Sequence, residues 1–536
     1  MNRNLLFAAL LAAGLAQAGL ADAADIKIVN LDQGTGQGLD DPTPTTPIGG
    51  NPGTTKGEQA QIVFQFAADL WGAALESDVE ILNTVTFQPL ACDATSGVLG
   101  SSGTNYIFAF EDGPDLPPGM LAETWYHSAL GDAIAGTDLG IINDLPADTP
   151  DIISQFNGKL GEPGCLTGNG WYYGLDGNTP SDRISLIDVI MHEMAHGLGF
   201  SGFNNLASGA LNQGIPDVYS TYVADNSTGK NWVDMTDAER VAAAKNNGHL
   251  VFFGQNVKDE APLVLTSGTD DDGNVKLYAP TALAQGSSFS HYDTSLTMNA
   301  LMEPFINDSL SADVLLDLTP ALFKDVGWTV NGGNQMLLDC DTGVPTSVTG
   351  GLIAGANIYA SAKAFAGGAE NLLVYRDQIR DHADVLADDE VITPDQHTSL
   401  LACLTDEATA TQFEEWGNGD TGEPCDPETE ECGPDVPDAI ALTNKVPVTG
   451  LSGTGGEVLY SFEAEAGSVL SIMTYGGTGD VSVYVSLGEE PTADSYDSRS
   501  TRAGNSETVR FTAPEAGTYY IKLAGTYGKL TLVARQ

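Results

Sequence analysis

Two histidines and a glutamate form the group of side chains in this sequence that is best suited to metal chemistry. The segment from residue 190 to 200 reads IMHEMAHGLGF. Apolar residues at positions 184, 187 and 189 precede it, which indicates a helix with His192 and His196 one turn apart on one face. Two imidazole nitrogens at that spacing can bind one Zn²⁺ at about 2.0 to 2.1 Å. Glu193 lies beside them, where it could take a proton from metal-bound water.

A catalytic zinc site needs a third protein ligand and one open position. Gly197 and Gly199 indicate that the helix ends there and that the chain turns sharply. His192, Glu193 and His196 form a His-Glu-x-x-His motif. In the compact extended form of this motif a third histidine follows three residues after the second glycine, but this chain has Gly202 there. The third ligand must therefore come from another part of the chain, and the candidates are His291, His249, Asp217 and Glu303. The residues around Asp217 are typical of a turn, and those around His249 of a strand entry.

The chain resembles the leishmanolysin-like branch of the metzincin metalloproteases. That branch keeps His-Glu-x-x-His-x-x-Gly, inserts a long segment before the third histidine, and then places a methionine turn beneath the metal. The matching stretches here are Phe289-Ser290-His291-Tyr292-Asp293 and Leu301-Met302-Glu303-Pro304. The resemblance implies that His291 is the third ligand and that Met302 is the turn methionine. It is specific across the helix and these two stretches, and looser elsewhere between residues 60 and 330.

These features favour a zinc endopeptidase that hydrolyses peptide bonds with metal-activated water. Zinc would polarise the scissile carbonyl, while Glu193 acts as the general base and returns the proton to the leaving amine. The alternative from another class is a secreted surface- or carbohydrate-binding protein with a structural zinc, which usually has four protein ligands. A zinc peptidase with Asp217 as third ligand is a further alternative. Residues 270–274 could hold Ca²⁺, although a solvated turn fits them better because the full loop pattern is absent.

Composition excludes several classes of partner. The 536 residues include 73 acidic and 21 basic side chains, which gives a formal net charge of −52. So negative a surface repels phosphates and anionic headgroups, which argues against nucleic acids and membrane surfaces. Arg3 precedes an apolar run from Leu5 to Leu20 and small-residue cleavage sites, the pattern of a secretory signal, and no later stretch is apolar enough to span a membrane. We expect a secreted, extracellular or periplasmic protein that acts on protein or peptide substrates.

The predicted fold class is α+β. Apolar residues recur at helical spacing between Gln59 and Leu75, capping boxes at Thr236 and Thr393 predict further helix starts, and residues 105–110 resemble a short strand. The expected segments are a signal peptide (1–23), a flexible or pro-segment (24–56), a metzincin-like zinc protease domain with a mixed sheet and an active-site helix (57–345), an insertion within it at the cleft or its rim (201–290), a helical segment (346–416), an acidic Pro-rich linker (417–438) and a small all-β sandwich (439–536).

The last segment has the alternation of apolar and polar residues that is typical of strands. Val481, Val483 and Val485 alternate with polar residues, and Gly-rich turns separate such runs. The segment resembles the bacterial pre-peptidase C-terminal domain at residues 476–485, 495–497 and 513–520. The resemblance implies an appendage of secreted peptidases that is often removed after export. Many such domains carry a cysteine pair, which this segment lacks.

Six cysteines in an exported chain predict disulfide bonds. Proximity along the chain pairs Cys92 with Cys165, Cys340 with Cys403, and Cys425 with Cys432.

Overall fold

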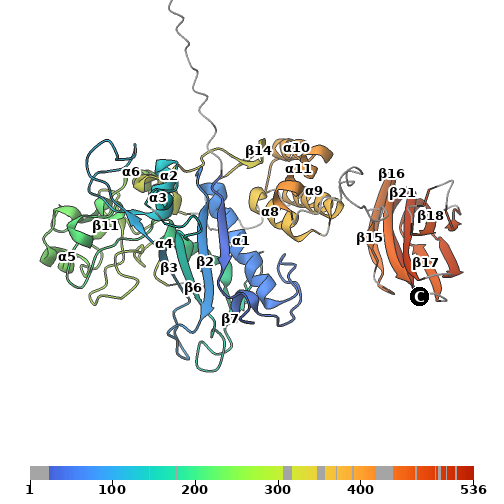
Figure 1. Cartoon of the computed structure of the whole chain (residues 1–536), viewed down its shortest axis with the longest axis horizontal. Coiled ribbons are helices and arrows are strands. Elements are labelled where there is room, and N and C mark those ends of the chain that lie inside the picture. The colour runs from blue at the N-terminus through green and yellow to red at the C-terminus, as the bar shows by residue number, and fades with distance from the viewer. Residues whose placement is uncertain are drawn as a thin grey trace, which may run out of the picture. The chain divides into compact units, whose positions relative to one another are not determined.

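The computed structural model describes residues 23–536, apart from residues 144, 176–178, 306–316, 347–356, 370, 389–390, 418–438, 443, 465–467, 489–490, 493–495, 503 and 514–515. The chain divides into two compact units, one of residues 1–369 and 375–418 and the other of residues 370–374 and 419–536 (Figure 1). Most of the predicted signal segment, nearly all of the acidic linker and the predicted Cys425–Cys432 pair lie outside the described residues.

The first unit contains a four-stranded sheet (Figure 1). Its strands lie in the order β1 (Ile26–Asn30), β2 (Ile81–Gln88), β6 (Ile152–Asn157) and β3 (Gly100–Thr104). The first three are parallel, whereas β3 runs antiparallel to β6, with Gly100 opposite Phe156. β3 is therefore an edge strand, and its outer side has no strand partner in the described part of this sheet.

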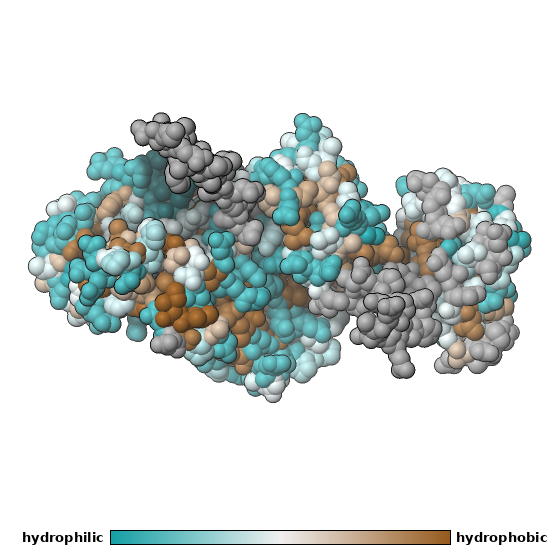
Figure 2. All heavy atoms as spheres, turned by 45° about the horizontal axis from the view of Figure 1, so that its top comes forward, coloured by the Kyte–Doolittle hydropathy of each residue, from teal (hydrophilic) through white to brown (hydrophobic). Residues whose placement is uncertain are grey.

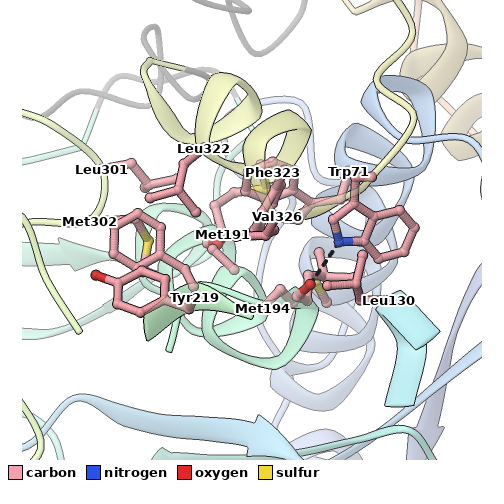
Figure 3. Close-up of a cluster of buried hydrophobic side chains, with 14 of the residues drawn as sticks. Trp71, Leu130, Met191, Met194, Tyr219, Leu301, Met302, Leu322, Phe323 and Val326 are labelled. Atoms are coloured by element: carbon pink, nitrogen blue, oxygen red, sulfur yellow. Dashed lines mark hydrogen bonds between the residues drawn. The ribbon is translucent and has the colours of Figure 1, made fainter. Parts of the chain in front are cut away.

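Two helices, α1 (Lys56–Ala74) and α4 (Leu186–Leu198), pack against this sheet and against each other. Thr55 starts α1 through a capping box with Glu58, and the Ser185 hydroxyl caps α4 by accepting from the Asp188 amide. Such caps satisfy amides that have no partner within the helix. The indole Nε1 of Trp71 donates to the carbonyl of Met191 at 3.1 Å, within a buried apolar cluster (Figure 3). The helices predicted around residues 59–75 and 190–196 are thus confirmed.

The segment from residue 24 to 56 differs from the flexible segment that its Gly- and Pro-rich composition predicts. It contributes β1 and the short helix η1 (Gly38–Asp40). Leu39 is fully buried, and the Asp32 carboxylate accepts from the amides of Leu39 and Phe87, each at 3.0 Å. Because these side-chain contacts tie the turns to β2, a segment that lacks helical or strand periodicity becomes an ordered part of the sheet.

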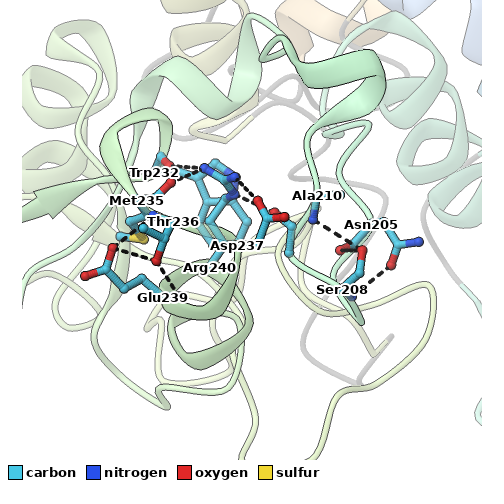
Figure 4. A network of polar contacts seen from close by, with 10 residues as sticks. Asn205, Ser208, Ala210, Trp232, Met235, Thr236, Asp237, Glu239 and Arg240 are labelled. Carbon is cyan, nitrogen blue, oxygen red and sulfur yellow. Dashed lines mark hydrogen bonds and ion pairs between the residues drawn. The ribbon is translucent and has the colours of Figure 1, made fainter.

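The insertion at residues 201–290 folds around a small antiparallel sheet with the strand order β10-β9-β11-β12. The buried guanidinium of Arg240 donates to the carbonyls of Gly209, Trp232 and Met235 and pairs with Asp237 (Figure 4). The capping box predicted at Thr236 is confirmed. The elements here are η2 (Asn212–Gly214), η3 (Tyr219–Tyr222), β9 (Val223–Asp225), β10 (Lys230–Asn231), η4 (Trp232–Asp234), α5 (Asp237–Ala243), β11 (Leu250–Phe252), α6 (Gln255–Val264) and β12 (Val275–Lys276).

The predicted helical segment at 346–416 lies mostly within the first unit and is not a separate body. Its helix α8 (Ile358–Gly368) packs on α1, where Lys363 Nζ lies 2.6 Å from the Asp69 carboxylate. The predicted Cys340–Cys403 and Cys92–Cys165 disulfides are both present. The remaining elements of the unit are β4 (Ile107–Phe108), β5 (Tyr126–His127), α2 (Ser128–Ala135), α3 (Leu139–Ile142), β7 (Gly170–Tyr172), β8 (Arg183–Ser185), α7 (Thr319–Val326), β13 (Asn334–Leu337), β14 (Cys340–Pro345), α9 (Leu372–Asp388), α10 (Pro394–Ala402) and α11 (Asp406–Trp416).

The second unit is all-β, as its alternating pattern predicts. Long strands pair antiparallel, and Val481, Val483 and Val485 are buried in one apolar core. Its strands are β15 (Ile440–Ala441), β16 (Val448–Ala464), β17 (Val469–Tyr475), β18 (Thr478–Leu487), β19 (Ser498–Ser500), β20 (Thr508–Thr512) and β21 (Gly517–Arg535).

The visible surface is mostly polar. Figure 2 shows mainly hydrophilic side chains, with apolar ones gathered in limited patches. Among the described residues, none of the helices has the length and the apolar character that a membrane span requires.

A buried pair of carboxyl groups joins α2 to the start of β6. Asp132 and Asp151 are 3% and 4% exposed, and they accept hydrogen bonds from the amides of Leu139 and Leu82. Tyr106 donates its hydroxyl proton to Asp151 at 2.9 Å. Burial, and the neighbouring Asp151 carboxylate, raise the pKa of Asp132 to about 8. The folded state therefore binds more protons than the unfolded state between that pKa and the ordinary aspartate value.

We predict that Asp132→Asn reduces the loss of stability as the pH rises from the acidic range through about 8. An asparagine keeps one acceptor and one donor but carries no charge to desolvate. The difference in unfolding free energy between Asp132→Asn and the native chain should favour the variant more at alkaline pH than at mildly acidic pH, by at least about 1 kcal/mol. Calorimetric melting across that range measures it. Asp234→Asn, at an exposed position, is the control. Parallel pH profiles for the native chain and Asp132→Asn would contradict the assignment.

Candidate metal centre

The helix α4 carries His192 and His196 toward a common point. Gly197 lies inside the helix, where a Cβ would meet Ile152 Cγ2 of β6 at 2.4 Å, so glycine permits the close packing of helix on sheet. The helix ends at Leu198, and Gly199 follows with φ 137°, as the two glycines predicted. Trp328 Nε1 donates to the Leu198 carbonyl at 2.8 Å, which holds this end of the helix.

His291 reaches the same point from the chain that follows the insertion. Its Nε2 lies 3.1 Å from His192 Nε2 and 3.3 Å from His196 Nε2. His196 and His291 are only 8% and 5% exposed. Among the described residues, these three histidines are the one group of three or more metal-ligand side chains whose donor atoms converge, all within 4.8 Å.

Each of the three rings is oriented by a hydrogen bond from its other nitrogen to a backbone carbonyl. His192 Nδ1 lies 2.7 Å from Leu301 O, His196 Nδ1 lies 2.8 Å from Phe200 O, and His291 Nδ1 lies 2.8 Å from Ser287 O. A carbonyl oxygen can only accept, so each Nδ1 carries the proton and each Nε2 presents a lone pair.

Burial keeps the three rings neutral. It lowers the pKa of His192, lowers that of His196 to about 3, and lowers that of His291 well below the usual range. Three neutral imidazoles whose lone pairs face one another repel unless a cation lies among them. The donor set therefore fits Zn²⁺, for which imidazole nitrogen is a preferred ligand.

Glu193 lies on the sheet side of the histidines, against the edge strand β3. A Cβ on Gly100 would lie 2.9 Å from Glu193 Oε1, so the carboxylate passes directly over this glycine. The backbone amide of Ser102 donates to the carboxylate, and burial raises the pKa of Glu193 to about 8. The side chain is thus held against β3, in the cleft that the three histidines also line.

These residues lie in a cleft of about 710 Å³. One wall is residues 95–102, which include the start of β3, and the other includes residues 285–287 at the end of the insertion and the turn at 301–305. Residues 201, 285–287 and 290 of the predicted insertion thus contribute to the lining of this cleft. The Cys92–Cys165 disulfide lies next to the first wall and joins it to Leu166, which also lines the cleft.

The structure does not bring the other candidate ligands to this point. The Asp217 carboxylate accepts from the Phe203 amide and from the amide and hydroxyl of Ser220. His249 is exposed, with its Nδ1 2.9 Å from Asn226 Oδ1, at the entry to β11 as its sequence predicts. Glu303 lines the cleft but is not part of the converging group.

Asp270 was the centre of the calcium alternative, and its carboxylate is already occupied. It accepts from the Asp272 amide, from the amide and side-chain nitrogen of Asn274, and from Asn226 Nδ2. Four nitrogen donors around one carboxylate leave it poorly suited to a cation, so the solvated-turn interpretation fits better.

Met302 is fully buried next to the residue that orients His192. Figure 3 shows it in the apolar cluster, at the same end as Tyr219 and Leu301. Its carbonyl accepts from the Tyr292 amide at 2.8 Å, which joins the turn at 301–305 to the residue after His291. The sequence did not predict the carbonyl groups that accept from the histidines, nor the contact of Gly100 with Glu193. Both involve backbone groups, which every residue has, so no residue type in the sequence points to them.

Comparison with known proteins identifies only the second unit. Residues 456–525 match the family described as the bacterial pre-peptidase C-terminal domain, which confirms that prediction. An alkaline serine exoprotease A of Vibrio alginolyticus is 41% identical over 18% of this chain and 19% of its own length. A zinc metalloprotease of Helicobacter pylori is 38% identical over 19% of this chain and 41% of its own. The solution structure named vEP C-ter 100 is 33% identical, covers 18% of this chain and all of its own, and has a TM-score of 0.17.

This chain spans less than half the length of each of these curated relatives. The similarity lies in the C-terminal domain. Relatives with this domain are named as serine and as zinc proteases, so the domain accompanies peptidases of more than one catalytic class. The chemistry of the first unit must therefore be inferred from its own side chains.

We predict that His291→Ala weakens zinc binding by at least about 100-fold. Removal of a group that only hydrogen-bonds to a ligand lowers metal affinity by about 10- to 100-fold, and removal of the ligand itself should lower it further. Metal content after dialysis and competition with a chromogenic chelator measure the affinity. His249→Ala is the matched control, since it removes an exposed imidazole outside the converging group. Zinc affinity unchanged in His291→Ala, or lost in His249→Ala, would contradict the assignment.

Proposed function

We propose that this chain is a secreted zinc endopeptidase of the leishmanolysin-like branch of the metzincins. The convergence of the Nε2 atoms of His192, His196 and His291, beside the buried carboxylate of Glu193 in an open cleft, is the observation that carries this proposal. The alternative, a structural zinc site in a binding protein, calls for four protein ligands. The described residues offer three at this point.

The three histidines would hold the metal, and Glu193 would act as the general base. A bound Zn²⁺ supplies a Lewis acid that polarises a carbonyl and lowers the pKa of water. Glu193 accepts a proton from the attacking water and then donates it to the amine of the leaving product. The Ser102 amide and the space over Gly100 hold the carboxylate in place through both transfers.

The edge strand β3 is suited to align an extended peptide in the cleft. Residues 100–102 of this strand line the cleft next to Glu193, and the outer side of the strand has no partner in the described sheet. An extended chain can add to such an edge through main-chain hydrogen bonds, which do not depend on side-chain identity. This arrangement supports cleavage within a polypeptide.

Secretion is supported by two observations. The N-terminal run with its small-residue sites resembles a signal peptide. The C-terminal domain matches a family named for its position in peptidase precursors, and the similar proteins bear the names of proteases.

We predict that Glu193→Gln lowers kcat on casein or a peptide substrate by about 10² to 10⁴-fold, because glutamine has a similar shape but cannot accept the proton. Zinc content should stay at that of the native chain. Hydrolysis should also stop when a chelator removes the metal and return when zinc is restored. Near-native turnover by Glu193→Gln, or hydrolysis that resists the chelator, would overturn the proposed mechanism.

We also predict that Gly100→Ala lowers kcat by about tenfold or more, because the added methyl group would lie 2.8 Å from Glu193 Cγ and push the carboxylate aside. Steady-state kinetics together with zinc analysis would test this. Gly103→Ala, in the same strand but with no atom within 4 Å of the added Cβ, is the matched control and should behave as the native chain. Equal kinetics in the two variants would refute a positioning role for Gly100.

A further inference from the structure

The charged side chains that line the cleft are all acidic. They are Asp188, Glu193 and Glu303, and no lysine or arginine belongs to the described lining. Glu193 is assigned to proton transfer, and Asp188 lies in the first turn of α4. Glu303 therefore remains as a cleft carboxylate without a role in the proposed reaction.

Glu303 lines the same cleft as the three histidines and is held by its own turn. Its Oε1 accepts from the Ala300 amide at 3.2 Å, and the residue is 6% exposed. Two residues earlier, the Leu301 carbonyl accepts from His192 Nδ1. The same short turn thus orients a candidate ligand and presents a carboxylate to the cleft.

The surroundings of Glu303 contain further negative charge. Burial raises its pKa to about 7, and the carboxylates of Asp317 and Asp293 add to this effect. None of the ion pairs in the described part of the chain includes any of these three residues. Buried carboxylates without a cation are unfavourable, and a positive group that enters the cleft would offset that penalty.

The remainder of this wall is apolar. Leu301, Pro304 and Phe305 line the cleft on either side of Glu303, and Phe305 is 59% exposed. An apolar wall with one carboxylate matches a side chain that has a methylene stem and a cationic end. Lysine and arginine are the side chains of a polypeptide with this chemistry.

We propose that the cleft selects polypeptides with a lysine or arginine next to the scissile bond, and that Glu303 determines this specificity. The inference rests on the proposed peptidase function and names its substrate class. Net charge adds to the effect, because an acidic chain of −52 attracts cationic substrates over a distance. The two effects can be separated. A local contact with Glu303 is lost only when Glu303 is changed, whereas the general attraction is weakened equally by the loss of any acidic side chain.

The test uses the full zinc-loaded chain and a set of fluorogenic peptides with one cleavable bond. The peptides differ only at the residues flanking that bond, where each carries arginine, lysine, norleucine or glutamate. The native chain should have a kcat/KM about 10- to 100-fold higher for arginine or lysine than for norleucine, the size expected of one charge-assisted hydrogen bond. Assays at about pH 8.5 keep Glu303 ionised and the substrate cationic.

Glu303→Gln should bring the ratio of kcat/KM for arginine over norleucine close to one, since glutamine keeps the acceptor for the Ala300 amide but loses the charge. Glu111→Gln is the matched control, because it removes the same charge from an exposed residue outside the cleft lining and should leave the native ratio unchanged. An equal fall of the ratio in both variants would assign the preference to net charge and overturn the role of Glu303. A native ratio in Glu303→Gln would overturn it as well.

Cleavage-site mapping by mass spectrometry on native casein tests the substrate class without any variant, in case Glu303→Gln does not fold. Lysine and arginine should be enriched beside the cleaved bonds. Cleavage without this enrichment would overturn the specificity and leave the peptidase proposal intact. Absence of any zinc-dependent cleavage, in contrast, would overturn the proposed function itself.

Discussion

Three hydrogen bonds from imidazole Nδ1 atoms to backbone carbonyls determine the character of the candidate site. They link His192 to Leu301, His196 to Phe200 and His291 to Ser287. Each bond fixes the tautomer of its ring and turns the other nitrogen toward the common point. Burial alone would make three neutral histidines, but only these contacts direct three lone pairs at one another.

The rest of the first unit holds those three carbonyls in place relative to α4. Trp71 and Trp328 donate to carbonyls of α4, and Gly197 lets this helix approach Ile152 closely. The turn at 301–305 is joined to the strand-like chain after His291 through the amide of Tyr292. A ring that is oriented from the backbone moves only if the backbone moves, so the site is preorganised by the apolar core in which α4 lies.

Local patterns in the sequence predicted the parts of the fold that depend on neighbouring residues. The helix with His192 and His196, the capping boxes at Thr236 and Thr393, and the alternation in β18 all have signals within a few residues. The position of His291 had no such signal, because 95 residues separate it from His196. Only the family resemblance singled it out from the other candidates. The sequence predicted a flexible or pro-segment at 24–56 and did not indicate its order, which comes from long-range contacts such as that of Asp32 with Phe87.

X-ray absorption at the zinc edge, on the full chain loaded with one equivalent of zinc, tests the central claim most directly. The account predicts three imidazole nitrogens at about 2.0 to 2.1 Å and one light atom from solvent, with no sulfur in the first coordination shell. A shell of two or fewer imidazoles, or one completed by thiolate or by carboxylates alone, would contradict it.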